Sequence, residues 1–249
     1  MSRFCTVLLV LVALMSAAMA AQKKAINVPA LLKRVDAAYY YPQRHGLRDL
    51  SVKISVPELE RQFAAQKITP KITFYWKAPK REKFVVSGFP QGQEAARDAV
   101  IQMLKGRGAV IVSTPNTEAL KDYKLTAARE KGLTVVRGTA KDPKSGMGQL
   151  ALWFRGNELT RMDADRAGAN VRITSIKTIK KGGQMLPSAM HGLVYAQSKS
   201  HPITTTFSYS QLKGIWLVDR IVSTVDRQKV EMRFSGHRVN RGVPDSIFK

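Results

Sequence analysis

The chain is almost without cysteine, and this limits how the protein can be held together. Its one cysteine, Cys5, lies within the first 20 residues, in a segment typical of an export leader. The exported product therefore has no thiol, which excludes both a disulfide framework and a cysteine-ligated metal site. Hydrophobic burial must stabilise the fold, and a chain of 249 residues is long enough to provide it.

Long apolar runs are also lacking, except at the N-terminus. Arg3 precedes the apolar run Thr6–Met15, and small residues follow, with an A-x-A cleavage pattern at Ala18-Met19-Ala20. We expect residues 1–20 to be a signal peptide cleaved near Ala20, and residues 21–249 to be a soluble periplasmic monomer. A retained membrane anchor is the alternative, but the run is short and ends in small residues.

Acidic residues are scarce. The sequence has 41 Lys and Arg against 18 Asp and Glu, a formal charge of +23, and loss of Arg3 with the leader would leave +22. Because an exported protein does not meet nucleic acid, we expect anionic lipid headgroups, lipopolysaccharide-like surfaces or acidic polymers as the counter-charge, and no nucleic-acid partner. The alternative is that the charge only keeps the protein soluble.

Motifs that carry chemistry are missing as well. The four histidines do not fall in a metal-ligand spacing, and Asp163-Ala164-Asp165 lacks the later ligands of a calcium loop. There is no GxSxG and no P-loop, and Gly106-Arg107-Gly108 follows a predicted helix instead of a strand. We therefore expect no catalytic residue, no metal and no cofactor. A hydrolase is a further alternative, but export of the protein is the only feature that suggests it.

The most informative stretch that is present is Ile72–Gly88, which predicts a β-hairpin. Ile72, Phe74 and Trp76 alternate with Thr73, Tyr75 and Lys77, which are expected to face outward. Ala78-Pro79-Lys80-Arg81 supplies a turn. Large apolar side chains on one face of a hairpin need a wider sheet or a covering helix to bury them. The rest of the chain predicts both.

Three helices are expected around this hairpin. Asn27 caps the first, whose apolar stripe runs through Val35 to Tyr39, and the second spans about Gln93 to Lys105. A third, short helix runs from Thr114-Pro115 to about Tyr123. Ala109–Ser113 is expected to be a short buried strand. A shift in apolar parity at Pro57 predicts a bulge or strand edge there.

From Leu125 onward the pattern is nearly all β, with turn signals between short strands. The strands are expected at about Leu133–Gly138, Gln149–Arg155, Glu158–Asp163, Val171–Ile179, Met190–Gln197, Thr204–Leu212, Ile215–Thr224 and Lys229–Ser235, after a first strand at Leu50–Val56. So many antiparallel strands must curl. We predict an α+β, mainly β fold: an unclosed antiparallel β-barrel of about eleven strands, forming a single domain, with a helical lid enclosing an apolar cavity.

Three segments carry a family resemblance. Ile72–Val86 (ITFYWKAPKREKFVV) resembles the G-x-L-W-x-K-R-P-x-x-F-R segment of the LolA/LolB-like lipoprotein carriers of Gram-negative envelopes. Val135–Ala164 resembles a later hairpin of that family, and Phe234–Lys249 resembles its closing strand. The resemblance implies an open half-barrel whose cavity takes acyl chains. The chain departs from the family at Ala78, where an arginine often precedes the proline, and in its helix at Pro90–Lys105.

The leading hypothesis is therefore a non-enzymatic carrier or sensor that binds the acyl chains of lipids or lipoproteins for envelope biogenesis, with a membrane or outer-membrane receptor surface as a further partner. A basic envelope adaptor for anionic polymers, headgroups or a protein is the alternative. The expected hydrophobic ligand-binding residues are Val52, Ile54, Phe74, Trp76, Phe84, Val86, Val100, Met103, Leu152 and Phe154. The expected headgroup or membrane contacts are Lys77, Lys80, Arg81 and Lys83 at the tip of the central hairpin.

Overall fold

The computed structural model describes residues 25–105, 107–145, 147–166, 169–196 and 199–249. The predicted signal peptide and its cleavage site near Ala20 lie outside these residues. None of the described helices is both long and apolar enough to cross a membrane.

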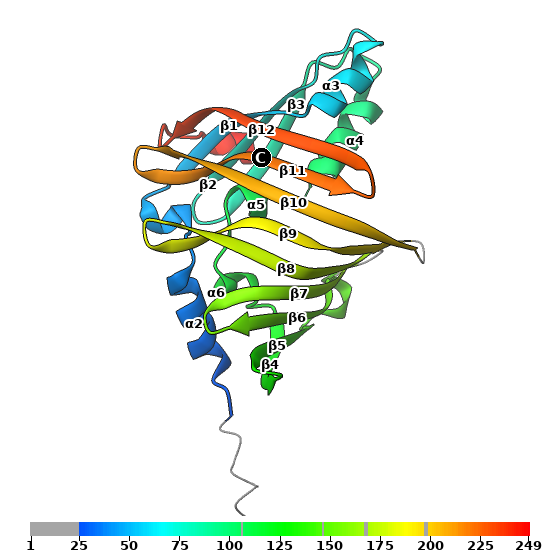
Figure 1. The fold of residues 1–249 in the computed structure, drawn as a ribbon. Coiled ribbons are helices and arrows are strands. Elements are labelled where there is room, and N and C mark those ends of the chain that lie inside the picture. Colours follow the sequence, from blue (N-terminus) through cyan, green and yellow to red (C-terminus); the bar gives the residue numbers. More distant parts are fainter. Residues whose placement is uncertain (1–24, 106, 146, 167–168, 197–198) are drawn as a thin grey trace, which may run out of the picture.

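Twelve strands in the described residues form one antiparallel sheet that stays open (Figure 1). The strands are β1 Asp49–Ser55, β2 Lys71–Lys77, β3 Arg81–Ser87, β4 Tyr123–Glu130, β5 Leu133–Ala140, β6 Met147–Arg155, β7 Glu158–Arg166, β8 Ala169–Lys181, β9 Gln184–Ala196, β10 Lys199–Leu212, β11 Ile215–Val225 and β12 Gln228–Val239. Their order is β3-β2-β1-β12-β11-β10-β9-β8-β7-β6-β5-β4, so β3 and β4 are the two free edges. This confirms the predicted unclosed fold, with one strand more than expected.

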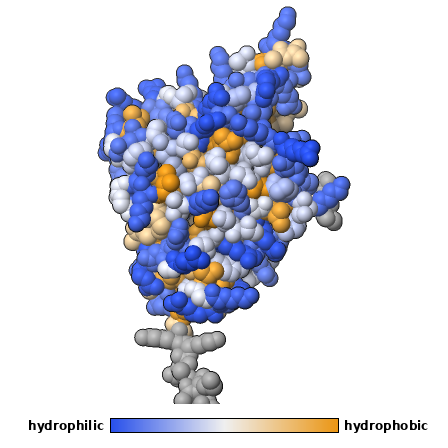
Figure 2. All heavy atoms as spheres, in the orientation of Figure 1, coloured by the Kyte–Doolittle hydropathy of each residue, from blue (hydrophilic) through white to orange (hydrophobic). Residues whose placement is uncertain are grey.

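Short helices cover the inner side of the curled sheet (Figure 1). The α-helices are α2 Val28–Ala38, α3 Pro57–Ala64, α4 Glu94–Leu104, α5 Gly108–Ile111 and α6 Asn116–Ala119, and the 3-10 turns are η1 Pro42–His45, η2 Pro143–Ser145 and η3 Asp245–Phe248. The outer face, by contrast, is mainly hydrophilic with scattered apolar spots (Figure 2). The sheet therefore has a covered side and a solvated side, as an antiparallel sheet can have.

The first helix begins as the sequence predicts. The Asn27 side chain accepts a hydrogen bond from the Ala30 amide at 2.9 Å, and proline occupies the first turn of α2. Leu31, Leu32 and Val35 are buried against the sheet. The helix ends at Ala38, and the next residue, Tyr39, is already extended.

The central hairpin is confirmed in register. Phe74 lies opposite Phe84, with ring centroids 4.8 Å apart, and Trp76 lies opposite Glu82. Ile72, Phe74 and Trp76 are all buried, while the residues between them are partly exposed. The alternation of the sequence thus sets which face of β2 meets the core.

The expected bulge at Pro57 is wrong, because α3 begins there. Proline suits the first helical turn, and Glu58 and Glu60 in that turn favour the positive end of the helix dipole. Leu59 and Phe63, four residues apart, are the buried residues of the helix. The change of apolar parity in the sequence marked a change from strand period to helix period.

The expected strand Ala109–Ser113 is also wrong. Gly108–Ile111 forms the single turn α5, which places Val110 outward and Ile111 in the core. A short apolar run fits a buried strand and a buried helical segment equally well, so periodicity does not separate them.

The third predicted helix is confirmed only in part. It is confined to α6, Asn116–Ala119, because the chain turns at Leu120 and the residues from Tyr123 onward pair with β5 as β4. β4 is the strand that the sequence did not predict. Only Tyr123, Leu125 and Ala127 of this strand pack against a core, so its apolar signal is weak.

The described residues form two apolar cores. The large core joins β1–β3, α3, α4 and β10–β12, and the small core joins α2 to β5 and β6. Between them β9 is only partly buried, with Leu186 as its one fully buried residue among those described. The inner face is therefore incompletely filled beside β9, and an apolar groove lies there.

Candidate functional site

Three cross-strand rows on β9–β12 form the floor of a groove. Residues directly opposite in an antiparallel pair share a face of the sheet, so each row presents its side chains to the same side. The rows are Met190–Thr205–Ser223–Val230, Ile203–Val225–Gln228 and Phe207–Ile221–Met232. All ten of these residues line one cavity of about 290 Å³. The floor is mainly aliphatic and aromatic, with a small polar strip.

The start of α5 forms the roof. Arg107 and Val110 line the cavity from this side, and Val110 is 42% exposed. A second cavity of about 180 Å³ shares Val110, Met190 and Phe207 with the first and continues to Trp216. We call the two together the α5 groove. Its combined space is that of a small ligand site.

The groove has one cation and no carboxylate among its lining residues. The Arg107 Nε donates only to the backbone oxygen of Met103, at 3.3 Å, and no carboxylate of the described residues forms an ion pair with it. Partial desolvation lowers the pKa of Arg107, although a guanidinium stays charged at any ordinary pH. The lining of the groove is thus mainly apolar, with Arg107 as its one charged residue.

The polar groups of the floor and wall satisfy one another. The hydroxyls of Thr205 and Ser223 are 3.1 Å apart, and the Tyr209 hydroxyl donates to the Pro187 oxygen at 2.8 Å. Burial raises the pKa of Tyr209 above its usual value. None of the lining residues is a histidine, cysteine, aspartate or glutamate. This chemistry suits holding an apolar ligand better than general acid–base catalysis.

The predicted ligand wall is divided between the two cores. Val52, Ile54, Phe74, Trp76, Val86 and Val100 lie in the large core, Phe84 packs on it, and Leu152 and Phe154 lie in the small core. The inward position expected for Met103 is wrong: its side chain is 41% exposed. None of the ten lines the α5 groove. Their contact with a ligand stays a prediction.

The predicted basic rim has partners within the chain. Lys77 and Arg81 contact Asp245 at 2.5 and 2.7 Å, and these bonds lower the pKa of Asp245. Lys80 pairs with Glu118 at 3.6 Å, and the Lys83 ammonium donates to the backbone oxygen of the C-terminal residue at 2.5 Å. The hairpin tip therefore holds the C-terminal turn η3, and the headgroup role of these four cations stays a prediction.

Sequence reasoning missed the residues of the α5 groove. The alternation in β10–β12 predicts which residues face inward, but it does not reveal which rows align or that α5 stops short of them. In the sequence, Arg107 stands out only as the middle residue of Gly106-Arg107-Gly108, a pattern weighed as a phosphate-binding loop. The pattern that could have indicated it is a lone arginine beside an apolar run, AVIV, with no acid nearby.

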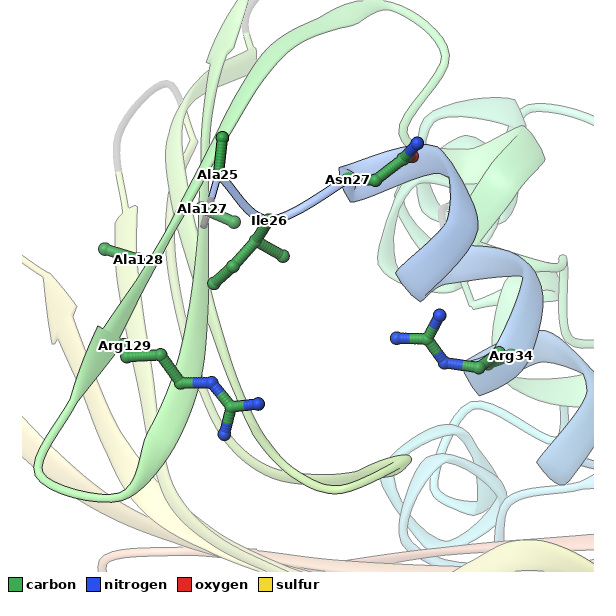
Figure 3. A pocket seen from close by; sticks show the side chains of 7 residues that line it. All are labelled: Ala25, Ile26, Asn27, Arg34, Ala127, Ala128 and Arg129. Atoms are coloured by element: carbon green, nitrogen blue, oxygen red, sulfur yellow. The ribbon is translucent and has the colours of Figure 1, made fainter. Parts of the chain in front are cut away.

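A separate cavity of about 620 Å³, outside the α5 groove, lies between α2 and the edge strand β4 (Figure 3). The guanidinium groups of Arg34 and Arg129 both point into it. Ala127, Ala128 and Arg129 are consecutive, so the cavity follows the edge of β4 and not one face. No carboxylate is among its described lining residues, which makes it a basic slot.

The described residues thus form an open half-barrel with an apolar groove on its inner face. No family model and no curated protein matches the sequence. The structure is similar to that of a putative outer membrane lipoprotein-sorting protein domain from Vibrio parahaemolyticus. The two sequences are 12% identical, and the match has a TM-score of 0.40 and covers 89% of this chain and 95% of that one. A DUF1329 family protein from Desulfovibrio piger is similar at 11% identity and a TM-score of 0.39 over the same shares.

The similarity to lipoprotein-sorting proteins expected from the sequence is therefore found among solved structures. At these TM-scores neither protein lends its role to this chain, and the function is inferred from the groove.

Proposed function

We propose that the mature protein is a non-enzymatic periplasmic carrier or sensor, one domain from residue 21 to 249, that holds an acyl chain of a lipid or lipoprotein in the α5 groove. The observation that carries this proposal is the cavity beneath α5, whose floor is made of three aligned and mainly apolar rows. Each methylene buried there contributes about 0.8 kcal/mol. Roughly eight would offset much of the cost of ordering the ligand.

Native mass spectrometry of the purified mature protein, followed by mild organic extraction, tests the proposal. A carrier releases a lipid. Val110→Trp should fill the groove and reduce the lipid-bound fraction, because Val110 already projects into it from a solvent-accessible turn. Val85→Trp is the matched control, since Val85 is similarly exposed but lies on β3, outside the groove. Equal lipid release from Val110→Trp and wild type would reject the groove as the site.

The basic slot supports a second candidate function, an envelope adaptor that binds an anionic polymer. Arg34 and Arg129 face one cavity with no acid among its lining residues, so an anion there would meet two cations. Binding of polyphosphate should then weaken as salt shortens the Debye length, and the double change Arg34→Gln, Arg129→Gln should reduce it. An adaptor would release no lipid, so extraction separates the two functions.

A further inference from the structure

Arg107 differs from three of the four cations of the predicted basic rim. Lys77, Lys80 and Arg81 each pair with a carboxylate of the chain itself. The Arg107 side chain instead has only a backbone oxygen at 3.3 Å, and it lies against the apolar floor of the groove. The side chain is also exposed to solvent, so its guanidinium is available to pair with an anion that a ligand brings to the groove.

The groove also has a direction. Arg107 and Gln228 line only the first cavity, whereas Leu186 and Trp216 line only the second, and Val110 lies on both. Arg107 and Val110 are three residues apart across the single turn of α5, which brings them to one side of it. A ligand with a negative head and an apolar tail fits this arrangement, with its head beside Arg107 and its tail directed toward Trp216.

We propose that the ligand of the α5 groove is a single-chain amphiphile with an oxyanion headgroup, which Arg107 binds while the tail passes Val110 toward Trp216. The inference rests on the proposed function and adds the class of ligand. The two cavities, of about 290 and about 180 Å³, suit one chain and not two. The planar guanidinium can form paired hydrogen bonds with a carboxylate or a phosphate.

Calorimetric titration of the mature protein with decanoate and decanol, which share a tail, tests the inference. A charge-assisted hydrogen bond is worth about 1.5–3 kcal/mol, so decanoate should bind about tenfold to a hundredfold more tightly. Arg107→Gln should weaken the binding of decanoate far more than that of decanol and so remove most of the difference, and Arg107→Lys should retain part of it. Arg34→Gln, in the basic slot, is the matched control and should change neither Kd. Decyl phosphate distinguishes a phosphate from a carboxylate head.

Each outcome bears on one proposal or the other. Equal affinity of the wild type for decanoate and decanol would overturn the headgroup inference while supporting the acyl-chain function. Binding of neither would overturn both. If Arg107→Gln weakens both ligands equally, Arg107 only shapes the groove, and its role as the headgroup partner is rejected.

Discussion

At the scale of single residues, Asp36 shows how one buried charge can fix two elements. It is 1% exposed on α2, and it accepts hydrogen bonds from Tyr41, Asn116 and Thr117. These bonds have lengths of 2.7–2.9 Å and include the hydroxyl of Thr117. Burial opposes ionisation, but the hydrogen bonds from Thr117 and Asn116 outweigh it and lower the pKa of Asp36. The carboxylate thus joins α2 to α6.

Replacing Asp36 by Ala should destabilise the fold by about 3 kcal/mol, because several buried donors lose their acceptor. Asp98→Ala, on an exposed side chain of α4, is the control and should have little effect. Urea denaturation at pH 7 measures both. Equal stability of the two variants would show that Asp36 does not hold α6.

The same residue predicts a dependence on pH. Folding lowers the pKa of Asp36. The ionised carboxylate therefore adds its full stabilisation at pH values above the unfolded pKa of about 4, and this stabilisation is lost as the pH falls through the lower pKa of the folded state. The stability gap between wild type and Asp36→Asn should therefore be constant from about pH 7 to 5 and shrink below about pH 4. A gap that does not change down to about pH 2 would contradict this.

Trp76 provides a test of register. It is buried on β2 and lies opposite Glu82, so an aspartate at this position would be an unpaired buried charge facing another acid. We expect Trp76→Asp to cost at least about 3 kcal/mol in urea unfolding. Val85→Asp, at a more exposed position of β3, should cost much less. A tolerated Trp76→Asp would mean that the hairpin register is wrong.

At the scale of elements, the hairpin tip and η3 hold each other. Asp245 bonds Lys77 and Arg81, and the Arg81 guanidinium lies over the Phe248 ring, 5.2 Å from its centroid. Motifs alone did not predict this contact, because the residues are more than 160 positions apart and meet only through the pairing of β1 with β12. The rim cations are therefore not simply available to a membrane.

Removing the carboxylate of Asp245 should leave two cations of the basic rim without their ion-pair partner. Asp245→Asn frees Lys77 and Arg81, so binding to anionic liposomes should increase over wild type at low salt and fall at high salt. Co-sedimentation measures it, and Asp98→Asn, which frees Arg97 on α4, is the control. Liposome binding unchanged by Asp245→Asn, or equal on neutral lipid, would leave the rim with a structural role only.

At the scale of the whole molecule, most of the strands could be predicted and the site could not. Alternating residues in β2 and β10–β12 carry a local signal of strand and face. The α5 groove depends on long-range structure. The register of four strands decides which residues align in rows, and the position of the single helical turn α5 decides where a cavity remains between it and these rows. Local patterns do not contain that information, so the sequence does not indicate the groove, and the ligand wall that it predicts at the hairpin stays a prediction.

Locating a bound acyl chain tests the proposed role of the α5 groove most directly. A decanoate analogue with a photoreactive diazirine in its tail, cross-linked to the mature protein and mapped by mass spectrometry, reports the residues beside the chain. We predict adducts at Val110, Met190 and Phe207, the residues shared by both cavities, and their loss in Val110→Trp. Adducts confined to Ile72–Val86 of the central hairpin, unchanged in that variant, would contradict it.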